Sequence, residues 1–218
     1  MGDIKICSFN CRGLGEFQKR RDVLNYLRQS EANIFLLQDI HCAPNKEKSF
    51  RNIWGSDIKV SCFSNTARGV AILSKSTELE YKQTQIDDRG NYVIAHVRIN
   101  DAIEVILGSI YGPNCDDPKF FKGIETICND MKGSEEIPVI LGGDFNLVLN
   151  QRIDTINYRN ENHPRATEML QSMMVDNNWI DIFRELNGDK RAFTWKCGTP
   201  PRKQARLDYF LVSEILQL

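Results

Sequence analysis

An aspartate and an asparagine stand two residues apart after an apolar run, at Asp144 and Asn146. In an extended segment, residues i and i+2 point to the same side, so the carboxylate and the carboxamide would be neighbours. Residues 137–141 predict a buried strand, ended by Gly142 and Gly143. The carboxylate could handle a water or a metal ion while the amide donates to a phosphoryl oxygen. All these polar residues are also turn formers, so a plain polar turn is the alternative interpretation.

Two further polar residues follow predicted strands in the first part of the chain. Residues 4–10 predict a strand that ends on Asn10, and residues 33–38 predict a buried strand followed by Asp39. A helix predicted from Phe17 onward separates them, which gives a βαβ-like arrangement. Because ligand-handling groups collect at the carboxyl ends of strands in such sheets, Asn10 and Asp39 are candidates for a site. A cap or turn at the strand exit is the alternative for Asp39.

The middle of the chain predicts further strands and helices. The strands are residues 69–73, 92–99 and 103–110, the last two joined by a turn at Asn100 and Asp101; the helices are residues 118–132 and a segment that starts at Pro164 with Asn162 as a candidate cap. The third strand leads into Tyr111. Its hydroxyl could point into a site, or its ring could pack as an ordinary aromatic residue.

A long hairpin with a basic tip is predicted near the end of the chain. Residues 192–195 and 207–212 look like two strands, linked by a loop dense in turn residues and positive charge. The basic side chains at its tip are Arg202, Lys203 and Arg206. They could pair with phosphates in a DNA groove. A solvated loop is the equally weighted alternative.

Composition predicts one intracellular globular domain. The chain has 218 residues, and its net charge of -1 argues against binding nucleic acid or membranes by bulk charge, so any contact with a polyanion must be local. Seven cysteines include no C-x-x-C pair, which favours neither a disulfide framework nor a zinc cluster, and a reducing compartment is the simplest fit. The sequence shows no signal-peptide pattern and no apolar run of membrane-spanning length, so no membrane partner is expected.

Six short motifs in a fixed order resemble the endonuclease/exonuclease/phosphatase superfamily, which includes DNase I and exonuclease III. They are Ser8-Phe-Asn10, Leu37-Gln38-Asp39-Ile-His41, Ile110-Tyr111-Gly-Pro-Asn114, Gly143-Asp144-Phe-Asn146, Phe193-Thr-Trp195 and Arg206-Leu-Asp208-Tyr209. Each motif alone is weak, but together they span nearly the whole chain. The closest similarity is to the apurinic-endonuclease-like domain at the front of LINE-type non-LTR retrotransposon proteins.

The resemblance implies a DNase I-like, four-layer α/β sandwich in which two mixed sheets pack face to face with helices outside. Residues 1–218 would form a single domain of this kind. The resemblance also implies phosphodiester cleavage with Mg²⁺, or with Mn²⁺ as the alternative, on double-stranded DNA in the nucleus. The nick would open a target site, and its 3′-hydroxyl would prime a reverse transcriptase domain downstream in the full-length protein.

The resemblance also implies roles for particular residues around the metal and the phosphate. Asp39 holds the position of the metal-binding acid, and Asn10 would assist at the metal and the scissile phosphate. Tyr111 would contact the phosphate and steady the transition state. A single carboxylate is enough for Mg²⁺, which keeps several waters and a substrate phosphate in its coordination sphere.

The remaining implied roles concern the attacking water, a phosphoryl oxygen, a catalytic histidine and the DNA backbone. Asp144 would orient or deprotonate the attacking water, and Asn146 would bind a phosphoryl oxygen. Asp208 matches the family carboxylate that holds a catalytic histidine in place. Thr194 lies where members of the family touch the DNA backbone.

Three departures from the family pattern bear on activity. Most members carry Glu at the position of Asp39, whose side chain is shorter by on the order of 1 Å, a displacement that can change rate roughly 100-fold. Ala205 replaces a serine that would contact phosphate. The Ser-Asp-His signature expected after the strand of Asp208 is not reached by residue 218, so the chain is expected to be a C-terminally shortened copy that cuts poorly. The three histidines, His41, His96 and His163, do not stand in that context, and His41 is interpreted as structural.

Three other functions fit the sequence less well. An abasic-site repair endonuclease keeps the chemistry but changes the substrate. A phosphatase or sphingomyelinase-like enzyme is disfavoured by the basic hairpin and by the lack of a lipid-facing apolar patch. A catalytically degenerate remnant that only binds DNA is the alternative outside enzymology, and the missing histidine signature supports it.

Overall fold

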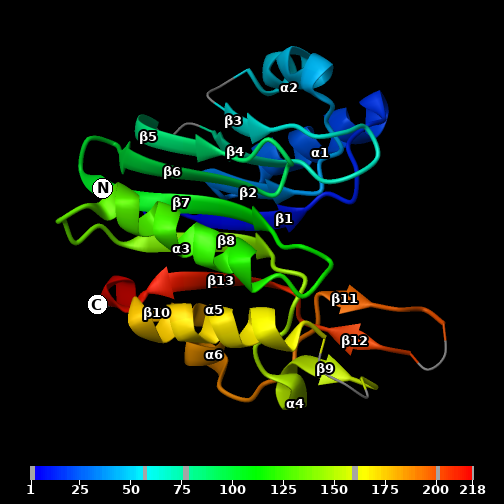
Figure 1. Cartoon of the computed structure of the whole chain (residues 1–218). Helices are drawn as coiled ribbons and strands as arrows, with labels where there is room; N and C mark the ends of the chain where they lie inside the picture. Colours follow the sequence, from blue (N-terminus) through cyan, green and yellow to red (C-terminus); the bar gives the residue numbers. More distant parts are fainter. Residues whose placement is uncertain (1–2, 56–57, 76–78, 159–161, 200–201, 218) are drawn as a thin grey trace. The chain divides into compact units, whose positions relative to one another are not determined.

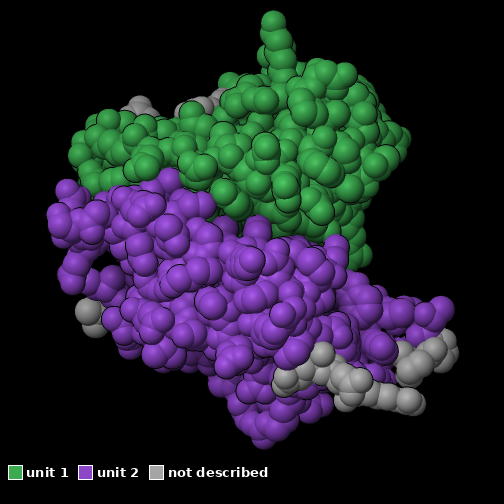
Figure 2. Space-filling view, viewed as in Figure 1, with its two compact units in different colours: residues 1–111, 141–143 green, residues 112–140, 144–218 purple. Residues whose placement is uncertain are grey.

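The computed structural model describes residues 3–55, 58–75, 79–158, 162–199 and 202–217 (Figure 1). The chain forms two compact units, shown in different colours in Figure 2. Unit 1 comprises Met1–Tyr111 and Leu141–Gly143, and unit 2 comprises Gly112–Ile140 and Asp144–Leu218. No helix in the described ranges has both the length and the apolar character that crossing a bilayer requires.

The first sheet of unit 1 has the strand order β1-β2-β4-β3. Its strands are β1 (Ile6–Asn10), β2 (Ile34–Gln38), β4 (Val70–Ser74) and β3 (Ile58–Ser61). Strand β1 is parallel to β2, and β4 is antiparallel to both of its neighbours, so the sheet is mixed. Three of these four strands were predicted within two residues; the alternation in β3 is too short to stand out from sequence.

Two helices cover the outer face of this sheet: α1 (Phe17–Gln29), and α2 (Glu47–Trp54), which follows the short 3₁₀ helix η1 (Pro44–Lys46) (Figure 1). Leu24 and Leu27 of α1 are buried in the same core cluster as Phe50 and Trp54 of α2. The spacing of three or four residues places these side chains on one face of each helix. Their burial against Phe35 and Leu37 of β2 attaches the helices to the sheet.

A second sheet packs against the first within unit 1. Its strands there run in the order β8-β7-β6-β5, formed by β5 (Leu79–Ile86), β6 (Tyr92–Ile99), β7 (Ile103–Tyr111) and β8 (Val139–Asp144). A polar contact joins the two sheets: Gln38 Nε2 donates to Ser109 Oγ at 3.1 Å, and Ser109 Oγ donates to the carbonyl of Leu37 at 2.9 Å. Both polar side chains are buried, so these bonds satisfy polar groups that water cannot reach, and Gln38 Nε2 also donates to the carbonyl of Leu36 in its own strand at 2.8 Å. This contact fixes how the carboxyl end of β2 lies against β7.

Strand β8 does not end at the two glycines, as the sequence predicted, but continues through them to Asp144. A Cβ atom on residue 143 would fall on the backbone carbonyl of Ile110. Gly143 is therefore needed because two backbones approach closely there, rather than because the chain turns.

Unit 2 contains β13 (Asp208–Ser213), which pairs antiparallel with β10 (Trp179–Asp181). Helices α3 (Pro118–Lys132) and α5 (Pro164–Asp176) pack together over these strands (Figure 1). The short helix α6 (Ile182–Asn187) follows β10, and η2 (Glu214–Gln217) follows β13. The bounds of α3 agree with the prediction. Helix α5 also begins at Pro164 as predicted, but its N-cap is His163 rather than Asn162.

An aromatic stack forms the centre of unit 2. The rings of Phe145 and Tyr209 are stacked with centroids 4.3 Å apart, and Phe121 of α3 stacks on Phe145 at 6.5 Å. All three side chains are buried. The stack therefore ties α3 and β13 to the segment that carries Asp144 and Asn146.

The predicted hairpin is wrong in its pairing. Strand β11 (Trp195–Lys196) pairs with β12 (Gln204–Ala205), inside the expected loop, and β12 pairs with β9 (Thr155–Ile156) to give a separate three-stranded sheet. The strand that was expected to be the second strand of the hairpin is β13, which belongs to the second sheet instead. Strand β9 and helix α4 (Gln151–Asp154) lie in a stretch that the sequence indicated to be irregular. Residues 200–201 of the expected loop lie outside the described residues.

The predicted α/β sandwich is confirmed. Unit 1 has two sheets face to face with helices outside one of them, and unit 2 places its helices over its own strands of the second sheet.

Candidate functional site

The first and second strands bring Asn10 and Asp39 to the same edge of unit 1. In the parallel pair β1–β2, Asn10 lies opposite Gln38, the residue before Asp39. The pairing continues beyond the strands, because the backbone N–H of Gly13 donates to the carbonyl of Asp39 at 2.7 Å. The Asn10 side chain accepts a hydrogen bond from the backbone N–H of Arg12 at 3.1 Å. The two predicted site residues of this edge are thus brought together.

The carboxylate of Asp39 is held through one oxygen. Oδ1 accepts a hydrogen bond from His41 Nε2 at 2.8 Å and another from the backbone N–H of Arg68 at 3.2 Å. Its side chain is 17% exposed, so it is sheltered but reachable. The described residues contain no group of three His, Cys, Asp or Glu side chains that could cage a metal. One carboxylate beside an amide oxygen suits Mg²⁺, which needs only one or two protein carboxylates when a phosphate and waters complete its shell.

A chain of hydrogen bonds links Asp39 to Tyr111 within unit 1. Arg68, whose backbone binds Asp39, donates from Nη1 to Asn91 Oδ1 at 3.3 Å. Asn91 Nδ2 donates to the carbonyl of Tyr111 at 2.8 Å, and the N–H of Tyr111 donates to the carbonyl of Asn91 at 2.7 Å. Asn91 is buried, so these bonds satisfy its amide in place of water. The position of Tyr111 at the end of β7 is therefore tied to the Asp39 edge.

Sequence reasoning missed Arg68 and Asn91, and it interpreted His41 only as structural. Arg68 precedes a short apolar strand, and Asn91 precedes β6, so both stand at strand starts where turn residues are common. For His41, the one available signal in the sequence was its spacing from Asp39, two residues, which is the same as the spacing of Asp144 and Asn146.

The thiol next to this edge is buried. Burial raises the pKa of Cys11 well above its usual value, and the negative charge of Asp39 raises it further.

In unit 2, Asp144 and Asn146 form a second predicted group. The backbone N–H of Asn146 donates to Asp144 Oδ1 at 3.0 Å, and Asn146 Nδ2 donates to the carbonyl of Gly112 at 2.7 Å. The N–H of Gly112 in turn donates to the carbonyl of Asp144 at 2.7 Å. Asn146 has a positive φ of 54°, which turns the chain away from the extended course that the sequence suggested. Asn146 reaches the Asp144 carboxylate with its backbone N–H in a tight turn, rather than with a side chain on a shared i, i+2 strand face.

Thr194 and Asp208 also meet in unit 2, through the backbone. Thr194 Oγ1 accepts the N–H groups of Leu207 and Asp208, each at 3.1 Å. The Thr194 side chain is exposed, so its hydroxyl hydrogen remains available to an outside acceptor. Asp208 is partly buried at the start of β13.

The basic residues of the predicted hairpin divide into two kinds. Arg202 and Lys203 are exposed, with Lys203 Nζ 5.2 Å from the ring centre of Tyr158. The expectation that Arg206 pairs with DNA phosphate is wrong, because this side chain is only 2% exposed. Its guanidinium donates to Asp154 from Nε at 2.7 Å and to Asp181 from Nη1 at 3.2 Å. Two buried carboxylates thus pair with the guanidinium that was expected to bind DNA phosphate.

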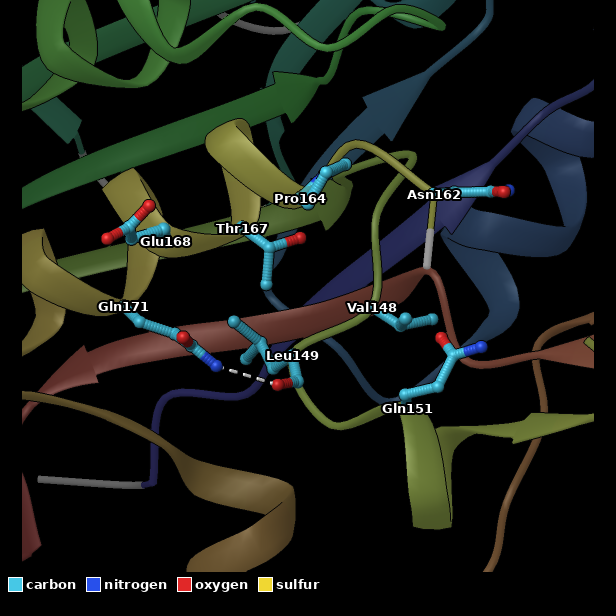
Figure 3. Close-up of a pocket in the computed structure, with 8 residues that line it drawn as sticks. All are labelled: Val148, Leu149, Gln151, Asn162, Pro164, Thr167, Glu168 and Gln171. Carbon is cyan, nitrogen blue, oxygen red and sulfur yellow. Dashed lines mark hydrogen bonds between the residues drawn. The ribbon is translucent and has the colours of Figure 1, made fainter. Parts of the chain in front are cut away.

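A pocket of ≈ 270 Å³ opens in unit 2, between the segment after Asn146 and helix α5 (Figure 3). Gln171 Nε2 donates to the carbonyl of Leu149 at one side of it, at 2.9 Å. Its lining consists of Val148, Leu149, Gln151, Asn162, Pro164, Thr167, Glu168 and Gln171. Among the described residues that line this pocket, none is a predicted site residue and Glu168 alone is ionisable.

Known proteins resemble this chain in sequence and in fold. The chain is 24% identical over 218 residues to the transposon TX1 uncharacterized 149 kDa protein of Xenopus laevis, a match that covers 98% of this chain but 16% of the Xenopus protein. The chain therefore spans about a sixth of that relative's length.

Solved structures with the same fold include an AP endonuclease, LMAP, from Leishmania major, with a TM-score of 0.77 and 15% identity over 97% of this chain and 79% of the other. The endonuclease domain of TRAS1, a telomere-specific non-LTR retrotransposon, has a TM-score of 0.63 and 15% identity over 99% and 87%. The sequence model of the family described as "Endonuclease/Exonuclease/phosphatase family" matches residues 7–217. With nearly its whole length matched, the chain belongs to the endonuclease/exonuclease/phosphatase family, and it resembles the apurinic-endonuclease-like domains of LINE-type retrotransposons.

Proposed function

We propose that this chain is a divalent-metal-dependent phosphodiesterase that nicks double-stranded DNA, as the target-site endonuclease of a non-LTR retrotransposon. The observation that carries the proposal is the convergence in unit 1. Asn10 and Asp39 share one sheet edge, and hydrogen bonds through Arg68 and Asn91 tie Tyr111 to it. The likeness to a transposon protein supports the retrotransposon role. The protein would nick its target DNA in the nucleus.

Asp39 and Asn10 would hold the cation, Mg²⁺ or Mn²⁺. Both side chains offer hard oxygen donors, and the described residues contain no group of three His, Cys, Asp or Glu side chains that could cage a softer metal. When bound, such a cation neutralises charge that develops on the phosphoryl oxygens. Asp39 contributes the negative charge that attracts the cation, and the two donors to Oδ1 keep the carboxylate in one orientation.

Asp144 would orient or deprotonate the attacking water, with Asn146 binding a phosphoryl oxygen. The N–H of Asn146 donates to one oxygen of Asp144 and so helps to orient the carboxylate for this role. One amide hydrogen of Asn146 is used by Gly112, and the second can donate to phosphate. Tyr111 would contact the phosphate, and Asp208 would orient a histidine.

DNA contacts would come from Thr194, Arg202 and Lys203. All three side chains are exposed, and they flank the small sheet of β9, β11 and β12. Hydroxyl and cationic side chains of this kind position a duplex through its phosphates without reading its sequence. In the natural protein, the 3′-hydroxyl at the nick would prime reverse transcription by a downstream domain.

The proposal is tested by nicking of supercoiled plasmid with Mg²⁺, using the natural protein that contains these residues. Asp144→Asn should lower the nicking rate about 10²–10⁴-fold, because the amide cannot accept a proton. Asp130→Asn, at an exposed position of α3, is the matched control and should nick normally. Normal nicking by Asp144→Asn, or no nicking by the wild type while it binds DNA, would overturn the proposal.

A second substrate separates the target-site role from abasic-site repair. Matched duplex oligonucleotides are used, one intact and one with a single abasic-site analogue. Comparable cleavage of both is expected of a target-site nickase, whereas cleavage restricted to the abasic duplex would point to repair.

A further inference from the structure

The turn after β2 places the side chains of Asp39 and His41 against each other. Asp39 and His41 both have positive φ values, 52° and 51°, while Ile40 between them is fully buried. The backbone of the turn is held on both sides, since Ile40 N–H donates to the carbonyl of Gly69 at 3.0 Å and His41 N–H to that of Arg68 at 2.8 Å. With Ile40 anchored in the core, the two polar residues project from the same short turn.

Left-handed backbone is concentrated around this turn. Arg12 and Arg68, whose segments flank it, also have positive φ values, 47° and 58°. Each such residue is strained relative to ordinary backbone, and strain of this kind persists only where the surrounding structure over-determines it. The clustering indicates that the surrounding structure holds the Asp39 carboxylate in a defined position.

The imidazole of His41 sits in a space made by a glycine. A Cβ atom on residue 13 would lie 2.6 Å from His41 Nδ1 and 3.1 Å from Cε1, so only glycine leaves room for the ring. Gly13 has a φ of +85° and also donates its N–H to the carbonyl of Asp39. The same glycine therefore fixes both the backbone of Asp39 and the ring that binds its carboxylate.

We infer that His41 is a positioning residue that presents the Asp39 carboxylate to the divalent cation. A carboxylate has only acceptors, so the 2.8 Å bond is donated by His41 Nε2, which fixes the ring tautomer. Both hydrogen bonds that the described structure gives the carboxylate reach Oδ1, and Oδ2 is left to the cation. The inference rests on the proposed function, because it assigns Asp39 as the metal ligand. Partners that orient a metal ligand from behind are commonly worth about 10–100-fold in metal affinity, by the general rule for outer-shell groups.

The test measures Mn²⁺ binding to the free protein by electron paramagnetic resonance, without DNA and independently of cleavage. His41→Leu removes the donor and should weaken Mn²⁺ binding about 10–100-fold. His41→Gln places an amide N–H near the position of Nε2 and should recover most of that loss. His96→Leu is the matched control, because His96 also donates to a carboxylate, Glu104, at 3.0 Å in the same unit, and Mn²⁺ affinity should not change. Thermal melting of each variant establishes that it is folded.

The outcomes separate this inference from the proposed function. If Asp39→Asn abolishes Mn²⁺ binding while folded His41→Leu binds like the wild type, His41 is not a positioning residue and the metal role of Asp39 stands. The positioning role is equally overturned if His41→Gln binds as weakly as His41→Leu, because a donor at that position then has no effect. If Asp39→Asn binds Mn²⁺ as well as the wild type does, the metal role of Asp39 fails, and the role of His41 fails with it.

Discussion

Arg206 and its two aspartates form a buried charged cluster in unit 2. Burial alone would lower the pKa of Arg206, but its hydrogen bonds to Asp154 and Asp181 raise it, so the guanidinium stays charged. Asp154 is fully buried and also binds Arg184, and Asp181 is 7% exposed. The cluster ties α4 and β10 to the residue just after β12, which makes its role structural.

Replacing Arg206 tests that role at the scale of one residue. Arg206→Met keeps most of the side-chain volume but leaves two buried carboxylates without their shared cation. The free energy of unfolding should fall by about 3–5 kcal/mol, the usual cost of breaking a buried ion pair by removing one partner. Urea denaturation measures it. The exposed Arg202→Met should change stability by less than about 0.5 kcal/mol. Equal stability of the two variants would contradict the structural role.

This residue also shows where sequence reasoning fails. Arg206 follows a run of basic residues, and its pattern is that of a cation on a loop tip. Its partners lie 25 and 52 positions away in the sequence, so the pattern gives no sign of them. Asn10, Asp39, Asp144 and Asn146 were predictable because each follows an apolar strand, and a strand delivers its last residue to a known edge.

At the scale of elements, the close approach of β8 to β7 depends on Gly143. Gly143→Ala puts a methyl group onto the carbonyl of Ile110, so either the strands separate or the backbone distorts. The expected loss is about 1–3 kcal/mol of unfolding free energy or more, the range for overpacking.

Gly123→Ala supplies the matched comparison. Gly123 lies within α3, and nothing would lie within 4 Å of its added Cβ. Because alanine favours a helix over glycine, this variant should gain about 0.5–1 kcal/mol. If the close approach matters, thermal unfolding should show a loss of stability for Gly143→Ala and a gain for Gly123→Ala. A Gly143→Ala protein as stable as the wild type would show that the strands have room.

Elements with strong periodicity were predictable, and so was the local hairpin of β6 and β7, but the pairing of β13 was not. Strand β6 and helix α3 agree with their predicted bounds because an alternating or amphipathic pattern runs through their whole length. The partner of β13 was mistaken because strand pairing is set by contacts between distant segments: β13 pairs with β10 rather than with the nearer β11. Helix α2 went unpredicted because its eight residues carry only a short apolar face.

At the scale of the whole molecule, a net charge of -1 means that the proposed DNA contacts must be local. Arg202 and Lys203 are the exposed cations proposed to contact phosphates. Replacing each with alanine should reduce the slope of log K against log salt by about 0.9, one released counterion per phosphate contact. Fluorescence anisotropy with a labelled duplex measures it. Lys119→Ala, an exposed lysine on α3, is the control and should leave the slope unchanged. Unchanged slopes for both hairpin variants would remove them from the DNA interface.

Plasmid nicking as a function of divalent metal is the most direct test of a metal-dependent nuclease site in this protein. The natural protein should convert supercoiled plasmid to the nicked form with Mg²⁺ or Mn²⁺. It should stop when the metal is chelated, and Asp39→Asn should lose the response to added metal. Nicking that continues after chelation, or that Asp39→Asn retains at the same Mg²⁺ concentration, would contradict a metal-dependent site at Asp39.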